Sequence, residues 1–260
     1  MATRGRPVRR VAIFVPLREH FAREVFMGVV SQARRHGWFF RLVPNLTTEV
    51  LGPFGPDGVI GFLHRTPENR IFEDLGVVAV NVSAADPPEE IPLVTLDNRW
   101  CGRLAAEHLL GTRIPRFAFI SAVDSHYARE RARGFSERLA EAGYPCEILR
   151  FTRPDAIDRG RVSIPKLMNV LRGVPRPVCI FAAHDLNGVS VVIAARELGL
   201  AVPEDMAVVG VDNDPIVCEA SDPPLSSVAV PGRQVGVRAA QLLQTLMDGG
   251  PAPAAPVLLA

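Results

Sequence analysis

Short apolar runs rich in β-branched residues alternate along the chain with longer amphipathic segments. Compact runs bounded by glycine, proline or polar residues predict strands, and apolar positions that recur every three or four residues predict helices. The predicted strands are Val8–Val15, Phe39–Val43, Val59–Phe62, Val77–Val80, Leu93–Leu96, Phe117–Ser121, Cys146–Phe151, Val178–Ala182, Ala207–Val211, Ser227–Val230 and Val257–Leu259. The predicted helices are Ala22–His36, Asp97–Leu110, Arg129–Ala142, Ile164–Leu171, Gly188–Leu198 and Arg233–Met247.

Strand–helix alternation is typical of parallel sheets that are covered by helices on both faces. The predicted elements form two successive sets, before and after about Ala122. We therefore predict an α/β fold with two doubly wound parallel-sheet lobes and a cleft between them. Ligands of open α/β sheets lie beyond the carboxyl ends of the strands, so the polar residues that follow each strand are candidates for a binding site.

Nearly every predicted strand is followed by a carboxylate, an amide, a histidine or an arginine. The polar residues at these positions include Arg18, Asp97, Asn98, Asp124, Tyr127, Arg131, His184, Asp185, Asp212 and Asn213. Sugars require this mixture, because a hydroxyl can donate to an aspartate while it accepts from an arginine or an asparagine. The alternative is that each aspartate caps the helix that follows it, which is the common role of an isolated aspartate. The two roles can coexist at Asp97 and Asp185.

Composition and charge narrow the class of protein. The chain has 260 residues, 48% of them hydrophobic and 22% charged, which is typical of a globular protein with a substantial core. The formal net charge of +1 predicts no overall attraction to nucleic acid or to an anionic membrane. No apolar segment is long enough to span a membrane, and Val11–Val15 is too short for the core of a signal peptide. We therefore expect a cytoplasmic location.

Motifs for catalysis and metal binding are absent from the sequence. There is no G-x-S-x-G elbow, Walker loop or G-x-G-x-x-G, and the four cysteines form no C-x-x-C pair. Asp124, Ser125 and His126 have the residue types of a catalytic triad, but triads are assembled in space and not from neighbours in sequence. His108 and His126 have no second ligand at a suitable spacing. We expect neither an enzyme nor a bound metal or cofactor.

Five stretches of the chain follow one another in the order of a known family. They are Val94–Asn98 with Gly102 and Ala105–Leu110, then Arg131–Phe135, then Ala183–Asp185 with Gly188, then Glu197–Asn213, and finally Pro224–Val228 with Gly236, Ala239, Ala240, Leu242 and Leu243. Together they resemble the effector domain of the LacI/GalR regulators, which shares its fold with periplasmic sugar-binding proteins. The resemblance extends from about Val8 to the end of the chain.

The resemblance implies that the chain crosses three times between the lobes. We expect residues 8–122 plus 228–248 in the N-terminal lobe and residues 123–227 plus 249–260 in the C-terminal lobe. The hinges are expected near Ala122, Ser227 and Gly249, and a ligand is expected to close the lobes. Residues 1–7 are expected to form a flexible leader. Within it Arg4–Pro7 resembles the core of a minor-groove AT-hook, although a single copy favours a solubilising leader.

A narrower resemblance is to xylose-operon regulators, in which the effector domain comes first and an AraC-type helix-turn-helix domain follows. It rests on Arg23–Val29, Ser227–Ala229 and Arg233–Gly236. It implies the ligand-sensing half of a dimeric transcription regulator, with a DNA-binding domain expected after residue 260 and a pentose such as xylose as the favoured ligand. The alternatives are a solute-binding protein of a sugar transporter, an α/β enzyme that acts on a sugar, and a regulator that binds a purine or no ligand.

Individual residues can be carried over from the family pattern. Arg131 matches the sugar-binding arginine, Asp212 matches the aspartate of the Gly-x-Asp-Asn strand end, and Asp185 matches the aspartate of an Asn-Asp pair in which His184 replaces the asparagine. Tyr127 or Trp100 can supply an aromatic face for a sugar ring, with ordinary packing as the alternative. The predicted ligand-binding residues are Arg18, Asp97, Tyr127, Arg131, His184, Asp185, Asp212 and Asn213.

Overall fold

The computed structural model describes residues 8–66, 69–150 and 163–260, and divides them into two compact units. The first unit runs up to Leu96 and resumes over Pro231–Leu259, and the second unit comprises Asp97–Val230 with Ala260. The predictions for the leader, and for the end of the strand expected to reach Phe151, lie outside the described residues.

The first unit contains a four-stranded parallel sheet with the order β2-β1-β3-β4, and β5 pairs in parallel with β11 beside it. Its elements are β1 (Arg10–Phe14), α1 (His20–His36), β2 (Phe39–Leu42), α2 (Thr48–Phe54), β3 (Gly58–Gly61), α3 (Arg70–Asp74), β4 (Val78–Asn81), β5 (Val94–Leu96), α9 (Gly232–Met247) and β11 (Val257–Leu259). Helices α2 and α3 pack on β1, β3 and β4 through one apolar cluster, and α1 packs against α9.

The second unit contains a five-stranded parallel sheet with the order β10-β9-β8-β6-β7. Its elements are α4 (Asn98–Leu110), β6 (Phe117–Ser121), α5 (His126–Glu141), β7 (Cys146–Arg150), α6 (Ile164–Gly173), β8 (Val178–Ala182), α7 (Asp185–Glu197), β9 (Met206–Asp212), α8 (Pro215–Glu219) and β10 (Ser226–Ala229). The predicted α/β fold with parallel sheets is therefore confirmed.

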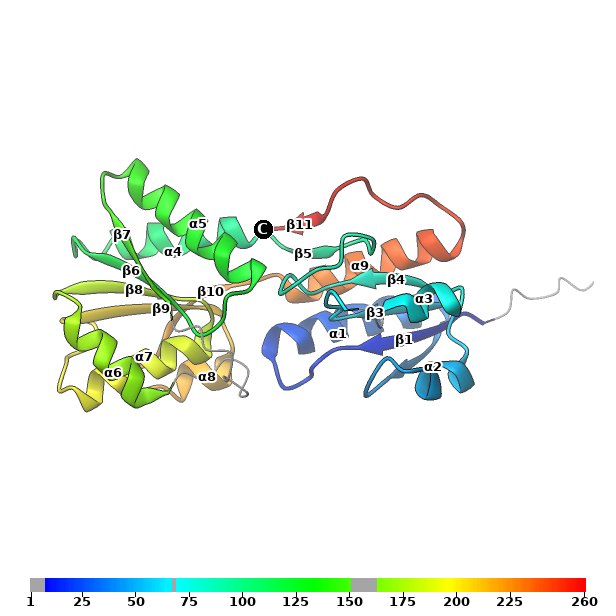
Figure 1. Ribbon diagram of the computed structural model, residues 1–260, viewed down its shortest axis with the longest axis horizontal. Helices are drawn as coiled ribbons and strands as arrows, with labels where there is room; N and C mark the ends of the chain where they lie inside the picture. The colour runs from blue at the N-terminus through cyan, green and yellow to red at the C-terminus, as the bar shows by residue number, and fades with distance from the viewer. Residues whose placement is uncertain (1–7, 67–68, 151–162) are drawn as a thin grey trace, which may run out of the picture. The chain divides into compact units, whose positions relative to one another are not determined.

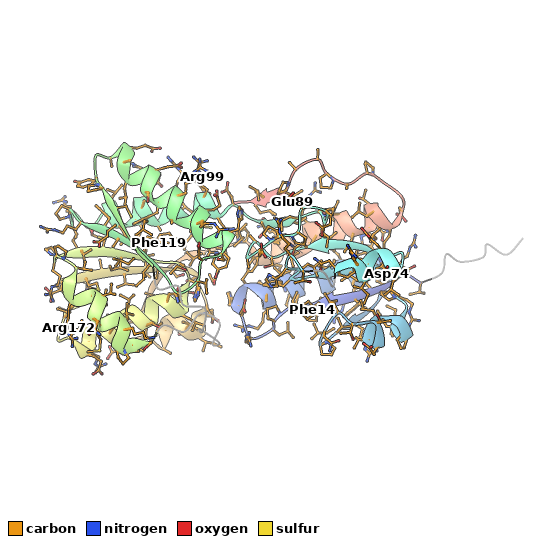
Figure 2. The ribbon with its side chains drawn as sticks, in the orientation of Figure 1. Phe14, Asp74, Glu89, Arg99, Phe119 and Arg172 are labelled. Carbon is orange, nitrogen blue, oxygen red and sulfur yellow. The ribbon has the colours of Figure 1, made fainter. Side chains whose placement is uncertain are left out.

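Two apolar clusters cover opposite faces of the second sheet. Ile120 and Ile180 pack with α6 and α7, whereas the neighbouring Phe119 and Phe181 pack with α4 and α5. Figure 1 shows these helix pairs on either side of the sheet, and Figure 2 labels Phe119 on β6. Alternate side chains of one strand point to opposite faces, so a strand buried on both faces has a continuous apolar sequence such as Val178–Ala182.

The boundaries of the units differ from the expected lobes. The first crossing falls between Leu96 and Asp97, and not near Ala122, because α4 packs on α5 and on the second sheet. The second crossing lies between Val230 and Pro231, three residues after Ser227 and therefore close to the expected hinge. Residues 249–259 also differ from expectation, since β11 pairs with β5 and belongs to the first unit.

Three short helices were not predicted, namely α2, α3 and α8. They have seven, five and five residues, so each is too short to show a helical repeat of apolar positions. Pro53 lies inside α2, and Pro215 begins α8, where its missing N–H leaves no helical bond unmade. None of the helices among the described residues combines the length and the hydropathy that a membrane span requires.

Two helix crossings bring backbones into direct contact through glycine. At the α4–α5 crossing, a β-carbon on Gly102 would overlap the carbonyl oxygen of Arg131, and one on Gly134 would overlap that of Arg99. At the α1–α9 crossing, Gly28 and Gly236 have the same relation to the carbonyl oxygens of Arg233 and Val25. A larger residue would push these helices apart, so the glycines set the spacing within each pair.

Candidate ligand-binding site

The carboxyl ends of β6, β8 and β9 lie next to one another in the second unit, because these three strands are neighbours in its sheet. Loops from these ends, together with the first turns of α4 and α5, carry most of the predicted site residues. Only Arg18 belongs to the first unit, where it follows β1 with an exposed side chain whose Nε is 3.9 Å from Oε1 of Glu19.

Arg131 is the centre of this arrangement. Its side chain comes from α5 and the residue is only 4% exposed. Nε donates a hydrogen bond of 2.9 Å to Oδ1 of Asn98, and Nη1 donates to the carbonyl oxygen of Ala183. Nη2 lies 3.8 Å from Oδ1 of Asp212. The guanidinium is thus fixed by α4 and by the end of β8, and it faces a carboxylate at the end of β9.

The ring of Tyr127 covers one face of this guanidinium. The distance from Cζ of Arg131 to the ring centroid is 5.1 Å, within the range of a cation–π contact. Tyr127 lies one helical turn before Arg131 on α5, so the same helix positions both side chains. The ring therefore supports the arginine, and this contact favours packing as one role of Tyr127.

Asp212 and Asn213 have an unusual backbone conformation. Their φ angles are +109° and +50°, both in the region that side chains other than glycine rarely adopt. The N–H of Asn213 donates to Oγ of Ser227 over 2.9 Å, and the N–H of Asp214 donates to Oδ2 of Asp185 over 2.8 Å. The side chain of Asn213 is exposed. The chain therefore turns sharply at the point where Asp212 faces Arg131.

Asp185 points into the protein. It is 2% exposed, and its two carboxylate oxygens accept from the N–H of Asp214 and from the hydroxyl of Ser227. Burial raises the pKa of this carboxyl, and the hydrogen bond from Ser227 works in the opposite direction. Both oxygens are used within the second unit, which favours a structural role over the direct ligand contact that the sequence suggested.

His184 precedes Asp185 and is half-buried beside Arg131. Burial, followed by the positive charge of Arg131, lowers the pKa of His184 to about 4. The imidazole is therefore neutral at pH 7, and it can offer one donor and one acceptor to a ligand. An asparagine at this position would also offer a donor and an acceptor, which makes the substitution chemically conservative.

Asp97 caps α4, because its Oδ1 accepts a hydrogen bond of 2.9 Å from the N–H of Trp100. The capping role that was the alternative at this position is therefore present. The Trp100 side chain is 40% exposed at the start of the same helix. Asp97 is also the first residue of the second unit, so its cap fixes the helix directly after a crossing.

Three residues of this arrangement were not predicted as part of the site. Asn98 was noted at a strand end, but its role as the anchor of Arg131 requires the packing of α4 on α5. Ser227 lies in β10, far in sequence from the residues that it joins. A β-carbon on Gly210 would overlap Oδ1 of Asp185, so this glycine makes room for the carboxylate. Gly210 and Ser227 lay within the family stretches, and no residue-level reason for them could be read from sequence.

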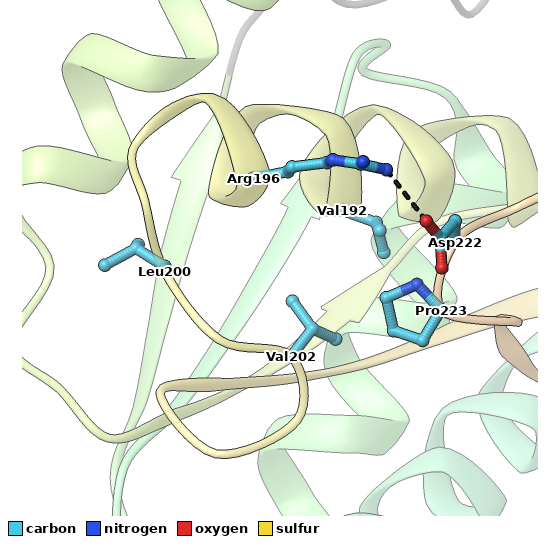
Figure 3. Close-up of a pocket in the computed structure, with 6 residues that line it drawn as sticks. All are labelled: Val192, Arg196, Leu200, Val202, Asp222 and Pro223. Atoms are coloured by element: carbon cyan, nitrogen blue, oxygen red, sulfur yellow. Dashed lines mark hydrogen bonds and ion pairs between the residues drawn. The ribbon is translucent and has the colours of Figure 1, made fainter.

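Two shallow pockets lie at the opposite, amino edge of the second sheet, where α7 ends and β9 begins. The first has a volume of about 210 Å³ and is lined by Val192, Arg196, Leu200, Val202, Asp222 and Pro223. Figure 3 shows the ion pair between Arg196 and Asp222 at 2.8 Å on its border. The second, of about 290 Å³, shares Val192, Val202 and Pro223 with it. Their linings are mainly apolar, in contrast to the polar residues around Arg131.

Within the ranges that the structure describes, no three or more histidine, cysteine, aspartate or glutamate side chains gather as metal ligands would. The residues around Arg131 provide one guanidinium, the carboxylate of Asp212, the neutral imidazole of His184 and the ring of Tyr127. This set is suited to hydrogen bonding with a neutral polar molecule.

Comparisons with known proteins match most of the chain. The family model of the periplasmic binding protein-like domain matches residues 106–260. The HTH-type transcriptional regulator CelR of Thermobifida fusca is 33% identical over 244 residues, which are 89% of this chain and 71% of that protein. The xylose operon regulatory protein of Haemophilus influenzae is 26% identical over 219 residues, which are 82% of this chain and 56% of that protein.

A solved structure, described as a complex of the transcriptional regulator CelR with cellobiose, has a TM-score of 0.76 and 29% sequence identity. The match covers 98% of this chain and 83% of that one. The chain thus spans a little over half to about seven tenths of the length of these two curated relatives.

Proposed function

Because this chain belongs to the family of periplasmic binding protein-like domains and matches LacI/GalR-type regulators over most of its length, we propose that it is the sugar-sensing domain of a transcriptional regulator. The observation that carries the proposal is the buried Arg131 beside Asp212. The two groups are 3.8 Å apart, which is longer than a direct hydrogen bond. A ligand hydroxyl can accept from the guanidinium and donate to the carboxylate, which is how a sugar is recognised.

The favoured ligand is a pentose such as xylose. Xylose operon regulatory proteins are among the relatives, and the neutral His184 adds a donor and an acceptor without adding charge. The opposite charges of Arg131 and Asp212 balance, so the site suits an uncharged ligand. A disaccharide is the second candidate, because the similar CelR structure is described as a complex with cellobiose.

We propose that the ligand signals by changing the balance between an open and a closed arrangement of the two units. A ligand shifts such a balance only by the difference between its affinities for the two states. The crossings at Leu96–Asp97 and Val230–Pro231 are the candidate hinges, since each leads directly into a helix that is held by a glycine crossing. Small-angle X-ray scattering with and without sugar tests this, with a smaller radius of gyration expected when sugar is bound.

Regulator activity further implies a homodimer that acts on DNA in the cytoplasm. The net charge of +1 argues that DNA contacts belong to a DNA-binding domain and not to this sensor. The alternative function is a solute-binding protein of a sugar transporter, which the family description also fits. The oligomeric state measured by sedimentation distinguishes the two functions, because a dimer supports the regulator.

A thermal-shift screen with D-xylose, other pentoses, cellobiose, hexoses and purines tests the function. A ligand at 100 times its dissociation constant adds about 2.7 kcal/mol to the free energy of unfolding. This corresponds to a rise in Tm of about 5–10 °C for a protein of this size. A rise with one sugar, lost in Asp212→Ala, is expected. A rise in Tm only with purines contradicts sugar sensing, and so does the absence of a rise with every compound.

A further inference from the structure

The backbone at Asp212 and Asn213 needs external support. Positive φ angles on residues other than glycine cost on the order of 1–3 kcal/mol each when the residue lies away from its preferred wells. Asn213, at +50°, lies in the left-handed region that asparagine tolerates, but Asp212, at +109°, lies outside it. Such a conformation persists only where the surroundings hold it in place.

Three hydrogen bonds to two side chains, Ser227 and Asp185, provide this support. The N–H of Asn213 donates to Oγ of Ser227, and the hydroxyl of Ser227 in turn donates to Oδ1 of Asp185. The other oxygen of Asp185 accepts from the N–H of Asp214. Both amides after Asp212 are therefore fixed to a single buried carboxylate, one directly and one through a hydroxyl.

Gly210 is the fourth part of this arrangement. The carboxylate of Asp185 occupies the space that a β-carbon at residue 210 would fill. Asp185 can reach the amide of Asp214 only because the strand that carries Asp212 has a glycine two residues earlier. The spacing Gly210-Val211-Asp212-Asn213 thus has a physical reason.

We propose that Asp185 and Ser227 are positioning residues, which hold the turn at Asp212 and thereby aim its carboxylate at Arg131. Asp185 then contributes to ligand affinity without touching the ligand. The expected effect of Asp185 and Ser227 on binding rests on the proposed function. Their effect on the turn at Asp212 is independent of any ligand.

The first test needs no ligand and follows amide hydrogen exchange by NMR. Ser227→Ala removes the acceptor of the Asn213 N–H and the donor to Asp185. Loss of one such hydrogen bond corresponds to about a tenfold change in the equilibrium between the bonded and the open amide, so the N–H of Asn213 should exchange about ten times faster. Ser227→Thr keeps a hydroxyl and should restore the slow exchange. Ser190→Ala, which removes a hydroxyl bonded to the carbonyl of Leu186 on α7, is the matched control and should have no effect on Asn213.

The second test is calorimetric titration with D-xylose. Ser227→Ala should weaken binding about tenfold or more, whereas Ser227→Thr and Ser190→Ala should bind within about threefold of the unmodified chain. Unchanged exchange at Asn213 in Ser227→Ala overturns the proposal, and so does unchanged D-xylose affinity in a variant whose exchange has accelerated. If the unmodified chain does not bind D-xylose, the favoured ligand of the proposed function is wrong, and the exchange experiment alone decides whether Ser227 holds the turn.

Discussion

The glycine crossing of α4 and α5 provides a sharp prediction, because it joins packing to the candidate site. A β-carbon added at Gly134 would overlap the carbonyl oxygen of Arg99, although such atoms are essentially never closer than 3.0 Å. The obstacle is backbone, so no side-chain rotation relieves it and the two helices must move apart. That movement separates Asn98 on α4 from Arg131 on α5, which are joined by a hydrogen bond of 2.9 Å.

The size of the effect follows from two opposing contributions. Overpacking costs about 1–3 kcal/mol, and replacing glycine by alanine within a helix gains up to about 1 kcal/mol. Because the overlap at Gly134 is with backbone, the upper end of the overpacking cost applies, and the net loss for Gly134→Ala is about 2 kcal/mol. For a protein of this size, a loss of 2 kcal/mol lowers Tm by about 4–8 °C.

Differential scanning calorimetry of Gly134→Ala and a matched variant measures this loss. Gly173→Ala is the control, because Gly173 ends α6 in the same unit and a β-carbon there meets no atom within 4 Å. Its Tm should stay the same or rise slightly. Equal Tm values for the two variants would refute the close backbone contact. Ion pairs such as Arg99–Glu137 also join α4 and α5 on the surface of this crossing, and Figure 2 labels Arg99. These ion pairs are exposed, so they contribute too little stability to offset the loss of the close helix contact.

Two further predictions concern the ionisable groups of the site. His184 has its pKa lowered to about 4, so protons bind the unfolded chain preferentially and stability falls as the pH drops from 6.5 to 4, by up to about 3 kcal/mol. His184→Asn should remove this loss of stability, which is measured as the free energy of unfolding in urea at pH 7 and pH 4.5. An identical pH dependence in the unmodified chain and in His184→Asn would contradict the lowered pKa. Arg131→Ala removes the two buried hydrogen bonds that Asn98 and the carbonyl oxygen of Ala183 accept from the guanidinium, so it should lower the free energy of unfolding by about 2–4 kcal/mol and abolish sugar binding. Retained sugar binding in a folded Arg131→Ala variant would exclude this arginine from the site.

The order of strands and helices along the chain was largely predictable, because strands that are buried on both faces have a continuous apolar sequence. Arg131 and Asp212 could be selected because they lie near strand ends at the ligand edge of a parallel sheet and because both match the pattern of the LacI/GalR effector domains. The resemblance to LacI/GalR effector domains is confirmed by the family match, and the AraC-type domain order stays a prediction.

The remaining features depend on contacts between residues distant in sequence. Helix α4 follows β5 directly, so the pattern assigned it to the first lobe, yet its glycine contact with α5 places it in the second unit. The inward orientation of Asp185 depends on the space beside Gly210 and on Ser227, which lies 42 residues away along the chain. A strand-end aspartate looks the same in sequence whether it faces a ligand or a neighbouring loop.

Calorimetric titration of the chain with D-xylose and cellobiose, in parallel with Asp212→Ala, tests the central claim most directly. Saturable binding of one of these sugars, with one molecule bound per chain, is predicted for the unmodified protein. Asp212→Ala should lose that binding while its thermal unfolding stays cooperative. Equal affinity in both proteins would contradict the site at Arg131 and Asp212, and no binding of any neutral sugar would contradict the sensing function itself.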